Sequence, residues 1–161
     1  MSGAILGFDP GLEGAIAAYW PDGAVEVLDI PTIGEGTKRC VDPYPIADWV
    51  AARDPILAVI EKVNAMREWG IGGTFRFGIA LGVVHGIVAA ARIPIEPAYP
   101  RVWKGHFDLI GQDKEADRQK AIHLCPKFAH LFSRKKDHQR ADALLMARYG
   151  ADLLRRRFTH E

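Results

Sequence analysis

This chain of 161 residues is poor in the features that mark secreted or membrane proteins. It has two cysteines, Cys40 and Cys125, which lie far apart and predict neither a disulfide framework nor a zinc site. Its longest apolar stretch, residues 79–91, contains two glycines and a histidine and is short for a membrane span. The first residues lack the basic start and cleavage site of a signal peptide. These absences predict a cytoplasmic protein with no membrane partner.

The chain also has almost no net charge, but its charge is unevenly distributed. The formal total is +1. Residues 1–100 carry 7 Lys and Arg against 12 Asp and Glu, whereas residues 101–161 carry 14 against 8. A polyanion would therefore bind to the C-terminal part of the chain. The alternative is that these charged residues simply lie on solvent-exposed faces of helices.

Hydrophobic periodicity and turn residues predict an α/β protein with one domain over residues 1–161. The expected strands are 4–9, 14–20, 24–30, 56–61 and 93–96. The expected helices are 44–53, 74–92, 101–106, 114–124 and 137–157. A mobile loop is expected over 66–74, because it holds three glycines. Three antiparallel strands followed by parallel strands, with helices on both faces, make a mixed five-stranded sheet whose order resembles the ribonuclease H-like fold.

Acidic residues stand at the ends of two expected strands and on the last helix. Asp9 ends the first strand before a Pro-Gly turn, and Glu61 ends the fourth. Asp142 lies in an apolar helical run, His138 lies one turn earlier on the same face, and Asp137 stands beside it. Carboxylates from separate elements suit Mg²⁺ or Mn²⁺. A pair of such ions about 3.5–4 Å apart can hydrolyse a phosphodiester.

Each of these residues also has an ordinary structural interpretation. Asp9 could fix the Pro-Gly turn, Glu61 could lie on the surface, Asp137 could cap the last helix, and His138 could be packed or solvated. Asp142 is harder to explain in this way, because a buried carboxylate is costly without a partner or a metal.

Several short motifs, in order along the chain, resemble those of the RuvC family of Holliday junction resolvases. They are Ile5-Leu6-Gly7-Phe8-Asp9-Pro10-Gly11, Val59-Ile60-Glu61-Lys62-Val63, Phe77-Gly78-Ile79-Ala80-Leu81-Gly82, Lys114-Glu115-Ala116 and Ala141-Asp142-Ala143-Leu144. The resemblance implies a homodimeric, magnesium-dependent endonuclease of DNA recombination and repair that makes paired nicks in four-way junctions. Mn²⁺ would substitute for Mg²⁺.

The resemblance also implies roles for individual residues. Asp9, Glu61 and Asp142 would be catalytic and would bind metal, with His138 and, less favourably, Asp137 as further ligands. Lys104 and Lys114 would lie near the scissile phosphates, and Lys114 and His138 would take part in catalysis. The residues expected to contact DNA are Lys62, Arg67, Arg76, Lys104, Arg134, Lys135, Lys136 and Arg140.

Two departures from the family pattern affect the expected site. The family's third acid falls at Gln139, or at His138 where there is one extra residue. The aromatic residue that many relatives insert into the junction falls at Asn64, so Trp69 or Phe75 is the expected substitute.

The expected central helix bears on assembly, because Gly78, Gly82 and Gly86 fall on one face. This face could pack on its own sheet or against a second subunit. Three other functions are compatible with parts of the sequence: an RNA-directed or general nuclease of the same fold, a non-hydrolytic junction-binding module, and an actin-like ATPase. The last of these requires a second such domain, for which the chain is too short.

Overall fold

The computed structural model describes residues 3–64 and 67–159 and has a central five-stranded sheet. The sheet order is β3-β2-β1-β6-β7. Its strands are β1 (Ala4–Asp9), β2 (Ala15–Tyr19), β3 (Val25–Asp29), β6 (Pro55–Glu61) and β7 (Ile95–Ala98). The first three strands pair antiparallel, and β1–β6 and β6–β7 pair parallel. The predicted mixed sheet is therefore confirmed.

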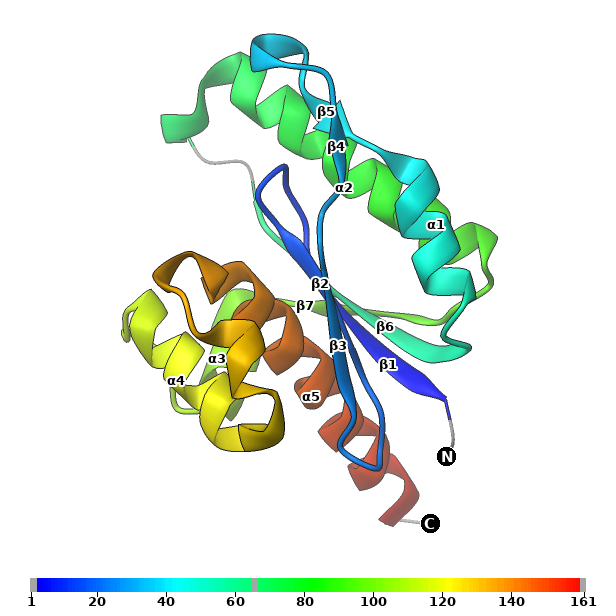
Figure 1. Ribbon diagram of the computed structural model, residues 1–161, viewed down its shortest axis with the longest axis vertical. Helices are drawn as coiled ribbons and strands as arrows, with labels where there is room; N and C mark the ends of the chain where they lie inside the picture. Colours follow the sequence, from blue (N-terminus) through cyan, green and yellow to red (C-terminus); the bar gives the residue numbers. More distant parts are fainter. Residues whose placement is uncertain (1–2, 65–66, 160–161) are drawn as a thin grey trace.

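Helices cover both faces of the sheet (Figure 1). One layer contains α1 (Pro43–Ala51) and α2 (Gly70–Ala90), and the other contains α3 (Pro100–His106), α4 (Lys114–Leu124) and α5 (His138–Thr159). Side chains alternate between two cores, because successive residues of a strand face opposite sides. Leu6 and Phe8 belong to the core with α1 and α2, whereas Ile5 belongs to the core with α5.

Polar caps explain where two of the helices begin. The Asp42 side chain accepts a hydrogen bond from the backbone N of Tyr44, and Pro43 takes the first position of α1. The Asp113 side chain accepts a hydrogen bond from the backbone N of Ala116 at the start of α4. Both caps satisfy backbone donors that a helix start leaves unpaired.

The mobile loop predicted over 66–74 is wrong for the described residues 67–74, which are helical. The short 3₁₀ helix η2 (Arg67–Trp69) leads directly into α2, which starts at Gly70. Only Gly70 takes a left-handed conformation, with φ 64°, so it makes the junction while Gly72 and Gly73 lie inside the helix. Met66 lies outside the described residues.

Smaller elements also differ from the prediction. The last strand lies two residues later than expected, at 95–98. Three short elements lie within the segment from 31 to 41: β4 (Thr32–Ile33), η1 (Gly36–Lys38) and β5 (Cys40–Val41). Two further 3₁₀ helices, η3 (Pro126–Phe132) and η4 (Lys135–Asp137), precede α5.

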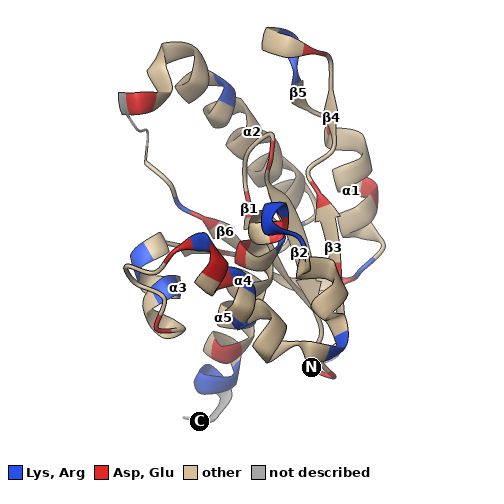
Figure 2. Ribbon diagram, turned by 60° about the vertical axis from the view of Figure 1, so that its left-hand side comes forward, with Lys and Arg blue, Asp and Glu red and all other residues tan. Residues whose placement is uncertain are grey.

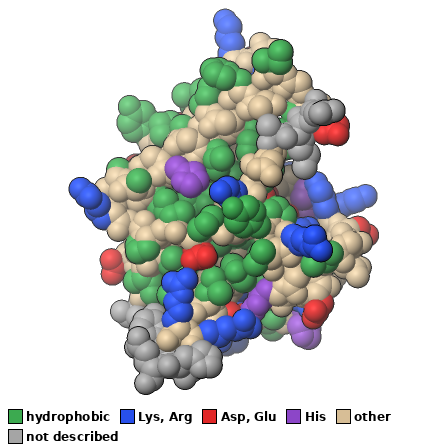
Figure 3. All heavy atoms as spheres, turned by 180° about the vertical axis from the view of Figure 1, so that it is seen from behind, with side chains coloured by type: hydrophobic (Ala, Val, Ile, Leu, Met, Phe, Trp, Pro, Cys, Tyr) green, Lys and Arg blue, Asp and Glu red, His purple; other side chains and the backbone are tan. Residues whose placement is uncertain are grey.

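The helix α2 packs on the sheet through a narrow stripe and leaves its other face open. Ala80, Val84 and Val88 are buried, but only 17% of its most apolar 18-residue stretch is. A Cβ built at Gly78 or Gly82 would meet nothing within 4 Å among the described residues. With 21 residues, α2 is long and apolar enough to cross a membrane by length and composition, which corrects the shorter stretch read from the sequence. Hydrophobic side chains also gather over the middle of the molecule's rear face (Figure 3).

Candidate active site

The three acids singled out in the sequence converge at one edge of the sheet. Asp9 ends β1 and Glu61 ends β6, and these neighbouring strands run parallel, with Phe8 opposite Ile60. Asp142 joins them from the second turn of α5, which packs directly on β1. The three carboxylates are thus held by three separate elements.

A glycine makes the close approach of α5 possible. A Cβ at Gly7 would lie 2.6 Å from the backbone N of Ala147 and closer still to the carbonyl oxygen of Ala143. The helix backbone therefore rests on the strand backbone at this point. Ala143 directly follows Asp142, so this contact brings the Asp142 carboxylate to the end of β1.

The acids line a cleft of about 680 Å³, here called the acid cleft. Its walls include residues 9–14, Glu61, Trp69, Phe77, Lys114, His138 and Asp142. In Figure 2 the acidic end of β6 lies close to acidic and basic turns of the α4–α5 layer. The cleft opens between that layer and the start of α2, since Lys114, His138 and Asp142 line one side and Trp69 and Phe77 the other.

Burial raises the pKa of all three carboxyl groups, and the charge of a neighbouring acid raises each further. Burial, and then the charge of Glu61, raises the pKa of Asp9 to about 8. Burial and the charge of Asp9 raise the pKa of Asp142 to about 9. Burial also raises the pKa of Glu61, against the lowering effects of a hydrogen bond from Trp103 and the charge of Lys104. Buried carboxyl groups whose charged forms are disfavoured in this way are suited to bind a cation.

The donor set fits a hard divalent ion. Oδ1 of Asp142 is buried and has no hydrogen-bond partner among the described residues, an arrangement that a cation would satisfy. Carboxylate oxygens are the ligands that Mg²⁺ and Mn²⁺ prefer. Within residues 3–64 and 67–159, no three His, Cys, Asp or Glu side chains already form a compact metal cage. Mg²⁺ commonly completes its coordination with water and substrate phosphate rather than with protein ligands alone.

His138 and Lys114 meet at the rim of the acid cleft. Nζ of Lys114 lies 3.1 Å from Nε2 of His138, and Nδ1 of His138 lies 3.3 Å from the carbonyl oxygen of Lys135. An ammonium only donates, so Nε2 accepts and the ring proton resides on Nδ1, which donates to the carbonyl. Both side chains line the cleft.

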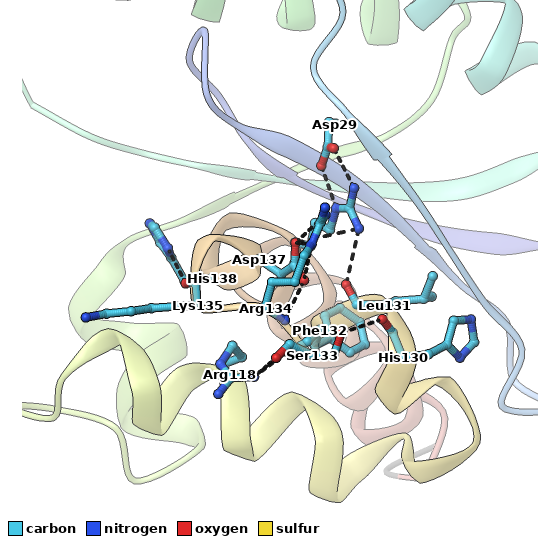
Figure 4. Close-up of polar contacts among 11 residues, drawn as sticks. Asp29, Arg118, His130, Leu131, Phe132, Ser133, Arg134, Lys135, Asp137 and His138 are labelled. Atoms are coloured by element: carbon cyan, nitrogen blue, oxygen red, sulfur yellow. Dashed lines mark hydrogen bonds and ion pairs between the residues drawn. The ribbon is translucent and has the colours of Figure 1, made fainter.

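Asp137 points to a different set of partners. It is buried, and its carboxylate accepts hydrogen bonds from the backbone N and the guanidinium of Arg134 (Figure 4). Burial acts to raise the pKa of Asp137, but the Arg134 hydrogen bonds hold it below its ordinary value. Arg140 lies 3.7 Å from Asp137 and also makes two hydrogen bonds to Asp29 on β3. Asp137 therefore anchors the start of α5 and does not line the acid cleft.

The residues expected to contact DNA differ in their surroundings. Arg134 and Arg140 are engaged in the ion pairs just described, whereas Lys135 and Lys136 are exposed beside His138. Lys62 directly follows Glu61 and lies over the ring of Tyr99, 5.2 Å from its centre. The exposed Arg76 lies on α2. The side chain of Arg67 lies outside the described residues.

Two functional candidates were missed in the sequence. Trp103 is fully buried and donates a hydrogen bond from Nε1 to Oε1 of Glu61 at 3.2 Å. Asp117 is fully buried and accepts a hydrogen bond from Nζ of Lys104 at 2.7 Å. No sequence motif indicates either residue, because the burial of both depends on how α3 and α4 pack.

The two proposed substitutes for the aromatic residue at Asn64 differ in exposure. Trp69 is half-buried, lines the acid cleft and packs on Phe77 with ring centres 4.9 Å apart. Phe75 is 68% exposed. Trp69 is thus part of the cleft wall, whereas the side chain of Phe75 is exposed to solvent and does not line the cleft.

Known structures that are similar to this chain share its fold. No family model and no curated protein matches the sequence. *T. thermophilus* RuvC in complex with a Holliday junction substrate is 18% identical, with a TM-score of 0.62 over 89% of this chain and 90% of that chain. A second *Thermus thermophilus* RuvC structure is 17% identical, with a TM-score of 0.55 over the same shares of each chain. The yeast mitochondrial Holliday junction resolvase is 17% identical, with a TM-score of 0.54 over 91% of this chain and 76% of that chain. The chain therefore has the RuvC-type, ribonuclease H-like fold.

Proposed function

We propose that this protein is a metal-dependent endonuclease that cuts four-way DNA junctions. The observation that carries the proposal is the convergence of Asp9, Glu61 and Asp142, each with a raised pKa, in one cleft of a fold shared with junction resolvases. The uneven charge supports a polyanionic substrate. A non-hydrolytic binding module would have no use for three buried carboxylates with raised pKa values in one cleft.

The residues of the acid cleft would have different roles in phosphodiester hydrolysis. Asp9, Glu61 and Asp142 would hold Mg²⁺ or Mn²⁺, which supplies Lewis-acid chemistry at the scissile phosphate. Trp103 fixes the orientation of Glu61 through its hydrogen bond. Lys114 presents an ammonium to a phosphate oxygen, and His138 holds that ammonium through Nε2.

Exposed basic residues beside the cleft would guide the DNA. Lys62, Lys135 and Lys136 stand on both sides of the acids and would contact the phosphate backbone without reading sequence. Arg134 and Arg140 support this surface from behind, because their guanidinium groups are bound to Asp137 and Asp29.

We further propose that the active form is a two-fold symmetric homodimer. A four-way junction has two equivalent strands to cut, and each chain supplies one acid cleft. The open face of α2, with its glycines and the half-exposed Ile79, is the surface that a second copy would cover. Light scattering tests the mass. Mapping of cut positions tests whether opposing strands are nicked symmetrically.

Cleavage assays test the activity directly. Purified protein with Mg²⁺ should cut a labelled four-way junction in preference to duplex, single strand and RNA–DNA hybrid. Asp9→Asn and Glu61→Gln should each abolish cutting while junction binding persists, and the surface variant Asp48→Asn should cut normally. Turnover in excess chelator would refute the metal mechanism. Preferential cutting of the hybrid would identify an RNA-directed nuclease instead.

A further inference from the structure

One buried charge near the acid cleft has no part in the mechanism above. Asp117 lies in the first turn of α4 and is completely buried. Its Oδ2 accepts a hydrogen bond from Nζ of Lys104 on α3. Its Oδ1 is also buried and has no partner among the described residues. The carboxylate is thus held by a single cation.

That cation acts on all three acids of the cleft. The charge of Lys104 lowers the pKa of Asp9, Glu61 and Asp142, so its ammonium lies within electrostatic reach of each. Burial acts to lower the pKa of Lys104, but the hydrogen bond to Asp117 and the charges of Asp142 and Glu61 raise it. Lys104 is therefore a charged ammonium beside three carboxylates.

The Lys104 ammonium nevertheless binds Asp117 and not the acids of the cleft. Among the described residues, the Lys104 side chain donates its hydrogen bond to Asp117 and to none of the three acids. Asp142 has a buried oxygen without a hydrogen-bond partner among the described residues, and its charge acts on the pKa of Lys104, so the ammonium is within electrostatic reach of it. A lysine on a flexible four-carbon stem would fold onto such an oxygen unless a stronger partner held it away.

We infer that Asp117 is a positioning residue that holds the Lys104 ammonium off the three acids and so leaves their oxygens to a divalent metal. Without Asp117, the ammonium would pair with Asp142 or Glu61 and compete with the metal for the same oxygens. The inference rests on the proposed function, because it takes these acids as metal ligands. It extends that function to a residue outside the acid cleft.

A purely stabilising role does not account for this arrangement. Buried ion pairs pay a desolvation cost that apolar residues of similar volume avoid, so they are weak contributors to stability. A pair built for stability would also bond both carboxylate oxygens, as Asp137 does with the backbone N and the guanidinium of Arg134. Asp117 instead has one buried oxygen without a hydrogen-bond partner among the described residues, and its other oxygen binds the Lys104 ammonium.

Direct metal binding tests the inference without nucleic acid or turnover. Mn²⁺ binding, followed by electron paramagnetic resonance, should weaken roughly tenfold in Asp117→Asn, as for the loss of a residue that orients metal ligands. The double variant Asp117→Asn with Lys104→Met should restore binding to the wild-type level, because the competing ammonium is gone. Asp113→Asn is the matched control on the same helix, since asparagine also caps helices, and should bind as wild type.

The double variant distinguishes a positioning role of Asp117 from a general loss of structure in Asp117→Asn. Wild-type Mn²⁺ affinity in Asp117→Asn would overturn the inference, and so would a double variant as weak as the single one. If circular dichroism shows that Asp117→Asn does not fold, Asp117→Leu with Lys104→Met replaces it. This apolar pair should bind Mn²⁺ as wild type, and failure to do so refutes the inference. A wild-type protein that binds Mn²⁺ but cuts no junction would refute the proposed function alone.

Discussion

Removing the Asp142 charge should make the metal-free protein more stable while it abolishes cleavage. A carboxyl whose pKa is raised in the folded state binds a proton there at pH values where the unfolded chain has already lost it. For Asp9 this window runs from 3.8 to about 8, and for Asp142 from 3.8 to about 9. Because the folded state binds more protons across this window, stability falls as the pH rises.

The size of the effect follows from these pKa shifts. Each pKa unit corresponds to about 1.4 kcal/mol of preference between the two protonation states. Water that enters the open cleft stabilises the charged carboxylates and reduces the effect below the full shift. We therefore expect Asp142→Asn to gain about 2 kcal/mol at pH 8, the usual cost of a buried, unsatisfied polar group. For a chain of this size that gain raises the Tm by roughly 4–8 °C.

Urea unfolding in excess chelator at several pH values between 6 and 9 measures this effect. The gain from Asp142→Asn should grow with pH, whereas Asp48→Asn, on the exposed face of α1, should match wild type throughout. Added Mg²⁺ should stabilise the wild type and leave Asp142→Asn nearly unchanged. An Asn variant less stable than wild type at pH 8 would show that Asp142 is held by favourable partners, and the metal-site argument would fail.

Two further pairs of substitutions test the geometry. His138→Ala should slow cleavage with little change in stability, whereas Asp137→Asn should cost about 3 kcal/mol of stability because it breaks a buried ion pair; an inactive but stable Asp137→Asn would reverse these roles. Gly7→Ala should destabilise the fold by about 3 kcal/mol or more, since the new methyl group would collide with the α5 backbone. Gly82→Ala, in open space on α2, should stabilise the monomer by up to about 1 kcal/mol and weaken any dimer formed there, as denaturation and light scattering would reveal.

Most of the sheet could be predicted because its strands carry strong local signals. The buried runs ending at Asp9 and Glu61 are bounded by turns, and their order along the chain limits the topology. The segment from 67 to 74 was predicted incorrectly, because three glycines indicate a loop when only Gly70 needs its conformational freedom. The strands β4 and β5 are two residues long, which is too short for any periodicity.

The acids of the cleft could be predicted for the same reason, since strand ends of a parallel pair meet at one edge. Their surroundings could not. Asp117 lies in a polar run in which nothing indicates its burial, because the packing of α4 on α5 decides which side turns inward. Arg134 and Arg140 read as exposed cations in the sequence. Their carboxylate partners include Asp29, more than a hundred residues away from Arg140 along the chain.

The position of α5 links these findings. Its contact with the sheet is set by two glycines, Gly7 on the strand and Gly150 on the helix, at each of which a Cβ would collide with atoms of the opposite element. Its start is tied to β3 by the Arg140–Asp29 pair. Steric contact thus fixes the distance of the helix from the sheet, and the ion pair fixes its start. Together they determine where the Asp142 carboxylate meets those of β1 and β6, so changes far from the acids should alter metal binding wherever they move this helix.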